Sequence, residues 1–337
     1  MKHYDIIAIG NATRDIFLQD AQYPVMANVP RRGESAFVLP IGGKIDVPTL
    51  VFATGGGASN AAATFANFVF HVAFCVTTGK DRRGGFVVND MRERGIDTSL
   101  VYRDPRSPTA YSVILTAPQH GRTVLTHRCD SVANQRHFAP LARRTAGWYY
   151  VTSLGGNLAL LRWIVILAAK NKTAVFCNPG AAELHQRGAF LKLAKNISIL
   201  LLNREEANLL TGTQNRSHED VVRLLARAYS GVLIVTDGRY GAMVHAGGTL
   251  YSCATHGIRH VVEWTGAGDA FGSGFLTGLL RSRGSVVDAL QYATANAESV
   301  LMKIGAKNGL LTAPPKRRVH VRRKVLIPTP AKGGGRS

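Results

Sequence analysis

The amino-acid sequence predicts an α/β protein in which helices cover both faces of a mainly parallel sheet. Helical segments at residues 158–170, 183–195 and 218–229 alternate with four short apolar segments, "WYYVTS", "TAVFCN", "ISILLLN" and "VLIVTDG". This alternation is typical of parallel strands joined by helical crossovers. The 337 residues, of which 46% are hydrophobic, supply enough apolar material for one large core. We therefore expect one main domain.

The other segments take their places in chain order. The chain opens with a strand at residues 5–10, and a helix opens at Asn60 and the alanines after it. A strand, "VAFCVTTG", leads into a helix that ends at Gly95. Residues 97–130 leave the alternation, because "AYSVILTAP" and "RTVLTHR" around "QHG" predict a hairpin; "GAMVHAGGTLYSCAT" predicts another. Two long helices, at 267–281 and 285–303, close the fold.

Composition argues against several classes of protein. The most apolar stretch, residues 158–169, is interrupted by Arg162 and is shorter than the roughly 20 residues that a membrane helix needs. Asp5 stands where a signal peptide would have its apolar centre, so we expect a cytoplasmic protein without a membrane partner. The four cysteines form no CxxC pair, which argues against a zinc site or a disulfide scaffold.

The net charge of +20 is unevenly distributed. Residues 316–337 contain eight Lys or Arg and no acidic residue. Such a segment favours a solvated, disordered extension, and an arm that binds nucleic acid is the alternative. The positive charge elsewhere is spread along the chain, and it suits an anionic substrate as well as it suits nucleic acid.

One carboxylate lies inside a glycine-rich stretch, "WTGAGDAFGSGF", at residues 264–275. A helix that begins near Ala267 leaves free backbone N–H groups at its first turn, and its dipole adds about half a positive charge there. An anion binds at such a place. The dipole also favours the ionised form of Asp269, which makes this residue a weak base but one well placed to accept a hydroxyl proton during phosphoryl transfer. The spacing excludes a dinucleotide fingerprint, a Walker loop and a nucleophile elbow. Tight helix packing explains the glycines but not the acid.

Three further motifs follow apolar strands, where ligands bind in open α/β sheets. In "TGGGASN", glycines allow a ligand near the backbone and Asn60 offers an amide; a plain loop is the alternative. In "LLNREEANLLTG", Asn203 and Glu206 either face a metal and phosphates or cap a helix. In "IVTDGRYGAMV", Thr236 and Gly238 either cover a nucleotide or form a simple hairpin.

In this order, the four motifs resemble the ribokinase-like family of sugar and nucleoside kinases, also called the phosphofructokinase B family. The resemblance extends from Ile6 to about Gly309. It implies a ribokinase-like three-layer α/β/α sandwich at residues 1–315, with a small β-sheet lid from about 12–54 and 97–130. In this family the lid closes over the sugar and often forms a dimer surface, so the resemblance implies a homodimer.

The resemblance also implies roles for individual residues. Asp269 is implied to be the catalytic base, with an anion hole formed by the backbone amides of Gly266, Ala267 and Gly268. The residues implied to bind the sugar are Asp15, Gly55, Gly56 and Asn60.

ATP and Mg²⁺ are the implied cofactors. Asn203 and Glu206 match the element that is tied to magnesium and phosphates, with Glu206 reaching the metal through water. Thr236 and Gly238 match the nucleotide loop. Asn296, in the last long helix, looks like a residue that lies beside the adenine.

The sequence departs from the family pattern at a few positions. Glu263 and Trp264 stand where an aspartate and a small or hydroxyl residue are usual. This region helps to hold a monovalent cation in some members, so a potassium requirement is left open. Val69, Ala110 and Cys129 stand where related chains tend to have glycine, and each costs on the order of 1 kcal/mol if its φ is positive.

The function that the resemblance implies is ATP-dependent, Mg-assisted phosphoryl transfer to a hydroxyl of a small sugar. A nucleoside kinase is the alternative, which a large apolar pocket under the lid would favour. A more distant alternative is a non-catalytic sugar-binding protein whose basic tail binds nucleic acid. The intact Asp269 argues against that last reading, since a pure sensor has no use for a base.

Overall fold

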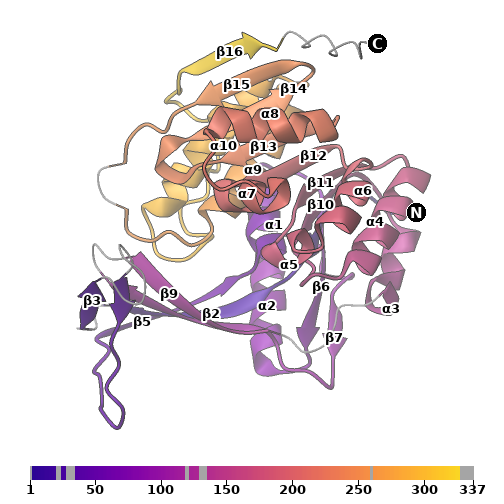
Figure 1. Cartoon of the computed structure of the whole chain (residues 1–337). Coiled ribbons are helices and arrows are strands. Elements are labelled where there is room, and N and C mark those ends of the chain that lie inside the picture. Colours follow the sequence, from indigo (N-terminus) through magenta and orange to yellow (C-terminus); the bar gives the residue numbers. More distant parts are fainter. Residues whose placement is uncertain are drawn as a thin grey trace, which may run out of the picture.

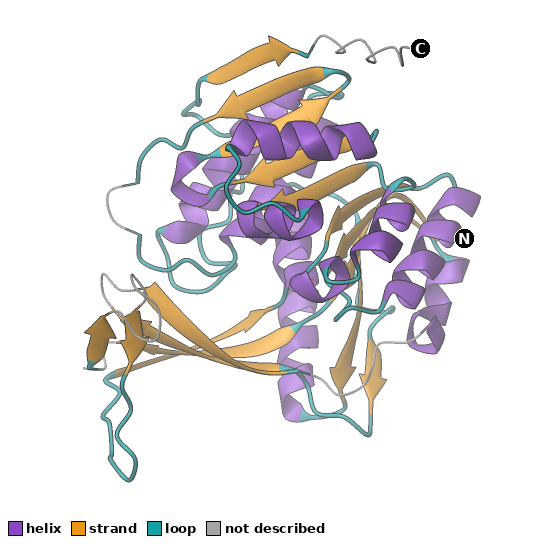
Figure 2. Ribbon diagram, viewed as in Figure 1, coloured by secondary structure: helices purple, strands orange, loops and turns teal. Residues whose placement is uncertain are grey.

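The computed structural model describes residues 2–19, 24–27, 35–117, 121–128, 135–258 and 261–326. A body of helices and one large sheet makes up most of the protein, and a smaller sheet projects from one side of it (Figure 1). Helices lie on both sides of the large sheet (Figure 2). Within the described ranges, no helix is both long and apolar enough to span a membrane. The α/β fold class with a separate small sheet is therefore as expected.

The main sheet has ten strands. In spatial order they are β16 (Val321–Val325), β15 (Thr249–Cys253), β14 (Ala242–Ala246), β13 (Val232–Thr236), β12 (Ile199–Asn203), β11 (Ala174–Asn178), β10 (Thr145–Thr152), β1 (His3–Gly10), β6 (Val72–Gly79) and β7 (Tyr102–Asp104). The strands from β13 to β7 are parallel, and β14, β15 and β16 continue the sheet in antiparallel pairs. The predicted hairpin over "AGG" is the β14–β15 pair.

Side chains of each strand alternate between two hydrophobic layers. On β1, Ile7 and Ile9 pack into one layer, and Ile6 and Ala8 pack into the other. The first layer is covered by α3 (Gln135–Phe138), α4 (Leu158–Lys170), α5 (Ala181–Leu184), α6 (Arg187–Ala194), α7 (Arg204–Thr211) and α8 (His218–Ala228). The second is covered by α1 (Gly57–Asn67), α2 (Arg82–Glu93), α9 (Ala267–Arg281) and α10 (Val286–Leu301). Helices on both faces give the three expected layers.

The smaller sheet contains four strands. They are β5 (Thr49–Gly55), β2 (Thr13–Gln19), β8 (Tyr111–Ala117) and β9 (Gly121–His127), in that spatial order. The short strands β3 (Val25–Ala27) and β4 (Ser35–Phe37) pair with each other. We call the four-stranded sheet the lid sheet. Because β2 leads away from β1 and β5 leads into α1, the lid sheet is joined to the body beside the glycines at 55–57.

Three expected boundaries differ from the structure. Residues 97–104 belong to the body rather than to the lid, because Asp97 bridges to Ala73 and β7 pairs with β6. The helix expected at 183–195 is divided into α5 and α6. The helix expected to open at Asn60 begins three residues earlier, at Gly57.

The expectation of a disordered tail from residue 316 is wrong for residues 321–325, which form β16. This strand pairs with β15 along its whole length. Just before it, Val319 is buried, and its backbone N–H and C=O bond the side chain of Gln291 at 2.7 and 2.9 Å. The basic character of "VRRKV" conceals a strand because four of its five residues are exposed at the sheet edge. Residues 327–337 lie outside the described part of the chain.

The sign of φ is known at two of the three positions where related chains tend to have glycine. Val69 has a φ of 63°, so its backbone is in the left-handed region. Ala110 is a described residue, and its φ is not positive. Cys129 lies outside the described residues.

Candidate active site

The first turn of α9 is an uncapped helix N-terminus. Gly266 precedes the helix with a φ of 84°, and no side chain caps it. The first backbone N–H groups of a helix have no partner within the helix, so those at Ala267 and Gly268 are available to an anion. A Cβ on Gly266 would lie 2.4 Å from Cβ of Ala306, so only glycine fits both the conformation and the packing. The three expected anion-hole residues thus form one turn.

Asp269 is the acidic residue of this turn, and it meets a residue from the other end of the chain. The amide Nδ2 of Asn60 donates to Oδ2 of Asp269 at 2.8 Å. Burial raises the pKa of Asp269, while the Asn60 hydrogen bond and the charge of Lys307 oppose that rise. The expectation that the helix dipole makes this carboxylate a weak base is wrong in direction, because desolvation is the larger effect and raises its pKa. A raised pKa makes Asp269 a stronger base than an exposed aspartate.

Asp15 and Asn60 present buried acceptor atoms to the same region. Asp15 is 4% exposed and Asn60 is 3% exposed. Among the described residues, Oδ1 of Asp15 and Oδ1 of Asn60 have no hydrogen-bond partner. Such buried acceptors are costly when unpaired, so hydroxyl groups of a ligand suit them. Burial also raises the pKa of Asp15, against hydrogen bonds from Thr13 and Ser112.

Two glycines shape the loop beside these acceptors. A Cβ on Gly55 would lie 2.0 Å from Oδ2 of Asp15, so glycine leaves the space that this carboxylate occupies. Gly56 has a φ of 92°, and a Cβ there would lie 2.6 Å from the backbone of Asn11 and Ala12. The four residues expected to bind a sugar therefore lie around one loop.

A cavity of about 450 Å³ begins at the same helix turn. Thr236 and Gly238, at the end of β13, line it together with Ala267 and Gly268. The remaining wall is mostly apolar and includes Tyr240, Ile258, Val261, Trp264, Phe271, Ala297 and Leu301. The expected nucleotide loop and the expected anion hole therefore border one cavity, which suits a flat apolar group with an anion at one end.

Asn203 and Glu206 form a helix cap at the start of α7. Oδ1 of Asn203 accepts from the backbone N–H of Glu206, and Oε2 of Glu206 accepts from the backbone N–H of Asn203, each at 2.8 Å. The capping alternative is therefore realised. Burial, together with the carboxylates of Glu205, Asp269 and Glu183, raises the pKa of Glu206. Neither residue lines the cavity described above.

Asn296, which the resemblance implies to lie beside the adenine, does not line that cavity. It is fully buried, and its amide donates to the backbone carbonyl of Ala270 at 2.8 Å and accepts from the N–H of Leu311 at 2.9 Å. The α10 residues that line the cavity are instead Thr294, Ala297, Glu298 and Leu301. An α-helix turns about 100° per residue, so Asn296 points away from the face that its neighbour Ala297 presents.

Sequence reasoning missed several groups near the site. Tyr240 and Trp264 line the cavity, and the signal for both was an aromatic residue within two positions of a motif glycine. Glu263, only 2% exposed, accepts from the backbone N–H of Thr265 at 2.6 Å and pairs with Arg122 of β9 at 3.4 Å. This ion pair joins the lid sheet to the chain just before the anion hole. Lys307, a buried lysine, had no local signal.

The described residues contain no group of three or more His, Cys, Asp or Glu side chains placed to hold a metal ion. A magnesium site does not require such a group. Mg²⁺ usually keeps several waters and binds through one or two carboxylates and substrate phosphates. The acidic neighbourhood of Glu206 fits an ion of that sort.

Comparisons with known proteins agree with the fold. Residues 33–313 match the model of the pfkB family carbohydrate kinases. A ribokinase of Haemophilus influenzae is 25% identical over 269 residues, which cover 77% of this chain and 85% of that protein. The structure of Arabidopsis thaliana ribokinase complexed with ribose and ATP superposes with a TM-score of 0.73 at 18% identity, covering 92% and 96% of the two chains. That of adenosine kinase from Sinorhizobium meliloti gives 0.72 at 24% identity, covering 90% and 95%. The chain therefore belongs to the pfkB family of carbohydrate kinases.

Proposed function

We propose that this kinase transfers the γ-phosphoryl group of ATP to a hydroxyl of a small sugar, with Asp269 as general base. The observation that carries the proposal is the hydrogen bond between Asn60 and Asp269. It brings the loop with unpaired buried acceptors to the uncapped turn that borders the apolar cavity. An acceptor, a base and an anion cradle thus lie in one place, which phosphoryl transfer requires.

The sugar lies against Asp15, Gly55, Gly56 and Asn60 in this proposal. Its hydroxyl groups donate to Oδ1 of Asp15 and Oδ1 of Asn60, which lack partners in the described part of the chain. The hydrogen bond to the carboxylate of Asp15 contributes about 1.5–3 kcal/mol, and the one to the neutral amide of Asn60 contributes about 0.5–1.5 kcal/mol. The two glycines bring the sugar close to the backbone, because a Cβ on either would collide with its neighbours.

ATP occupies the cavity, with its base against the apolar wall that includes Tyr240 and Trp264. Its transferred phosphate lies at the backbone N–H groups of Gly266, Ala267 and Gly268. Thr236 and Gly238 border the phosphate end of the cavity. Glu206 would hold a magnesium ion through water, and the ion supplies charge neutralisation of the phosphates when it is bound.

Asp269 removes the proton of the attacking hydroxyl as the oxygen bonds to phosphorus. The bond from phosphorus to the leaving oxygen of ADP breaks in the same step. Asn60 fixes the orientation of the carboxylate, and the raised pKa of Asp269 strengthens it as a base. Turnover therefore falls as the pH drops through that raised pKa.

A nucleoside is the alternative acceptor. The adenosine kinase similarity favours it, since that protein covers 90% of this chain with a TM-score of 0.72. The acceptor site then needs room for a base under the lid sheet, beyond the ribose that Asp15 and Asn60 would bind.

The lid sheet also offers a surface for a second copy of the chain. Leu50 and Phe52 on β5, and Leu125 on β9, are exposed apolar side chains on one face of this sheet. We propose that they form a homodimer interface, which Leu50→Lys would disrupt. Light scattering after gel filtration reads the oligomeric state, and an unchanged mass for the variant contradicts this interface.

One screen tests the proposed function. Purified protein with Mg²⁺-ATP is assayed for ADP release against a panel of sugars and nucleosides, with and without potassium. Turnover with a sugar supports the proposal, and turnover confined to nucleosides selects the alternative. A panel without any acceptor-dependent ADP release contradicts both and favours the non-catalytic sugar-binding protein.

A further inference from the structure

Lys307 is a buried cation that the proposed transfer step does not use. It is 8% exposed. Its Nζ donates to Oγ1 of Thr54 at 2.5 Å and to Oγ of Ser59 at 2.8 Å, and it forms an ion pair with Oδ2 of Asp90 at 2.9 Å. An ammonium is held in the interior only when partners of this kind replace its water.

The two hydroxyl partners flank the proposed sugar loop. Thr54 comes directly before Gly55, and Ser59 comes directly before Asn60. Nζ of Lys307 therefore links the end of β5 to the first turn of α1. Thr54 also donates to Asp90, so the same contacts tie the loop to α2.

The segment that carries Lys307 also touches the proposed anion hole. Ala306 packs directly on Gly266, where a Cβ would lie 2.4 Å from Cβ of Ala306 and 2.8 Å from its Cα. We call residues 305–307 the strut. The strut thus contacts the anion hole through Ala306 and the sugar loop through Lys307, although those two sites come from opposite ends of the chain.

The charge of Lys307 acts on both carboxylates of the site. It lowers the pKa of Asp15 and of Asp269, against the burial that raises each of them. Its own pKa is lowered to about 8, by burial first. The other charged groups around it are Asp90, Glu93 and Arg94 at α2, Arg14 and Asp15 on β2, Asp269 on α9, and Lys303 just after α10.

We propose that Lys307 is a positioning residue of the transfer reaction, which fixes the sugar loop against the anion hole and sets its positive charge beside Asp15 and Asp269. This inference rests on the proposed function. Lys307 touches neither the transferred phosphate nor the reacting hydroxyl in this account. It acts through the residues that do.

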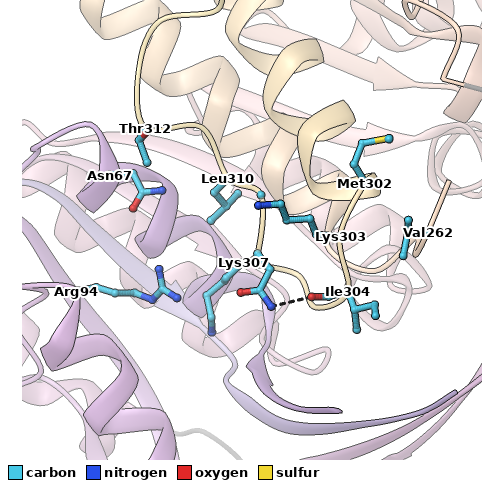
Figure 3. A pocket seen from close by; sticks show the side chains of 11 residues that line it. Asn67, Arg94, Val262, Met302, Lys303, Ile304, Lys307, Leu310 and Thr312 are labelled. Carbon is cyan, nitrogen blue, oxygen red and sulfur yellow. Dashed lines mark hydrogen bonds between the residues drawn. The ribbon is translucent and has the colours of Figure 1, made fainter. Parts of the chain in front are cut away.

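Lys303 provides a matched control. Lys303 and Lys307 line one pocket of about 630 Å³ together with Arg94 (Figure 3). Lys303 is exposed, and its side chain makes no hydrogen bond or ion pair with a described residue. Lys303→Met therefore removes the same charge from the same pocket without removing a contact, and we expect wild-type kinetics.

The test compares pH profiles of kcat and KM for the acceptor found in the screen. For Lys307→Met we expect kcat to fall by on the order of tenfold or more, with KM for the acceptor raised. We also expect the acid limb of kcat/KM to move upward by about half a pH unit or more, because both carboxylates lose a stabilising cation. A folded fraction that is constant with pH scales the whole profile and leaves the position of the limb unchanged, so circular dichroism at each pH separates the shift from acid unfolding.

Two further measurements test the inference even if Lys307→Met does not fold. The variant Thr54→Val with Ser59→Ala keeps the charge and removes the two hydroxyl contacts, so we expect a raised KM with the acid limb in its wild-type position. The wild type alone is expected to lose kcat/KM above about pH 8, where Lys307 loses its proton. A wild-type profile that is flat up to pH 9.5, or a Lys307→Met profile that matches Lys303→Met, would overturn the inference.

Failure of the proposed function is separable from failure of this inference. A wild type without turnover on any acceptor contradicts the function alone. In that case, carboxyl ¹³C NMR titration of wild type and Lys307→Met, with signals assigned from Asp15→Asn and Asp269→Asn, reads the same electrostatic link. Higher pKa values for both aspartates in the variant support the link, and unchanged values overturn it.

Discussion

At the scale of single residues, the glycines in the site occupy positions where a Cβ would clash with a neighbouring side chain or with the backbone. Gly55 leaves room for Asp15, and Gly266 leaves room for Ala306. The sequence indicated these positions because glycines preceded a polar residue in both motifs. The sequence could not show that Ala297 lines the cavity and Asn296 does not, because this depends on which face of α10 meets the cavity.

Gly55→Ala tests the close approach of Asp15. The new Cβ would lie 2.0 Å from Oδ2 of this carboxylate, so Asp15 has to move away from the sugar loop. We expect KM for the acceptor to rise by on the order of a hundredfold, since a displacement of about 1 Å has that effect on a preorganised site. KM for ATP should stay within about twofold. An unchanged acceptor KM in initial-rate kinetics would show that Asp15 does not bind the acceptor.

Val69→Gly tests the cost of a left-handed valine. Val69 is 91% exposed and has a φ of 63°, so its side chain contributes strain without core packing. We expect the free energy of unfolding to rise by about 1 kcal/mol in urea denaturation. Ala110→Gly is the control: Ala110 is buried and lacks positive φ, so glycine there should lower stability. A destabilised Val69→Gly would contradict the strain argument.

At the scale of elements, apolar strands and long helices were predictable, and polar edge elements were not. The helices at 158–170 and 267–281 have the expected bounds, because their apolar patterns and flanking residues are local signals. The strand β16 was missed because its sequence is basic, and its pairing with β15 depends on a neighbour far away in the sequence. The strand β7 was also missed, because it has only three residues and its pairing with β6 is not visible in the local sequence.

Truncation distinguishes a structural role of the C-terminal segment from a role in binding. Removal of residues 316–337 takes away β16 and leaves the buried side chain of Gln291 without its partner Val319. We expect a loss of about 2–4 kcal/mol in the free energy of unfolding, from one unpaired buried amide and the lost strand. Removal of residues 327–337 alone should leave stability unchanged. Equal stability of both truncated proteins in urea would contradict the structural role of β16.

The same two truncated proteins address the nucleic-acid alternative. Retention on immobilised DNA that is sensitive to salt, and that is lost when residues 316–337 are removed while turnover persists, would support a second role for the tail. Retention that is equal in the full chain and in the chain without residues 316–337 would exclude that role.

At the scale of the whole molecule, the site exists only because distant segments fold together. Asn60 meets Asp269, and Lys307 meets Thr54 and Asp90, across most of the chain length. The order of the motifs indicated the first of these contacts through the family resemblance. The second could not be foreseen, because Lys307 stands in a segment without any pattern that distinguishes it from an exposed lysine.

Global stability should carry the signature of the buried Lys307. Its pKa is about 8 in the folded protein and 10.5 for an ordinary lysine, so between these values the unfolded chain binds more protons. Folded stability therefore rises with pH across this window. From pH 7.5 to 9.5 we expect the free energy of unfolding of wild type, relative to Lys307→Met, to increase by about 2 kcal/mol. A difference that is constant in urea titrations at both pH values would contradict a buried, charged Lys307.

Asp269→Asn tests the central claim most directly, because it removes the base and keeps an amide of the same shape beside Asn60. With the acceptor from the screen, kcat is measured by ADP release and acceptor affinity by calorimetry. We predict that kcat falls by several orders of magnitude, on the order of 10³-fold or more, while the acceptor Kd changes by less than about tenfold. Near-normal turnover of Asp269→Asn would contradict the assignment of this carboxylate as the base and, with it, the proposed phosphoryl transfer at this site.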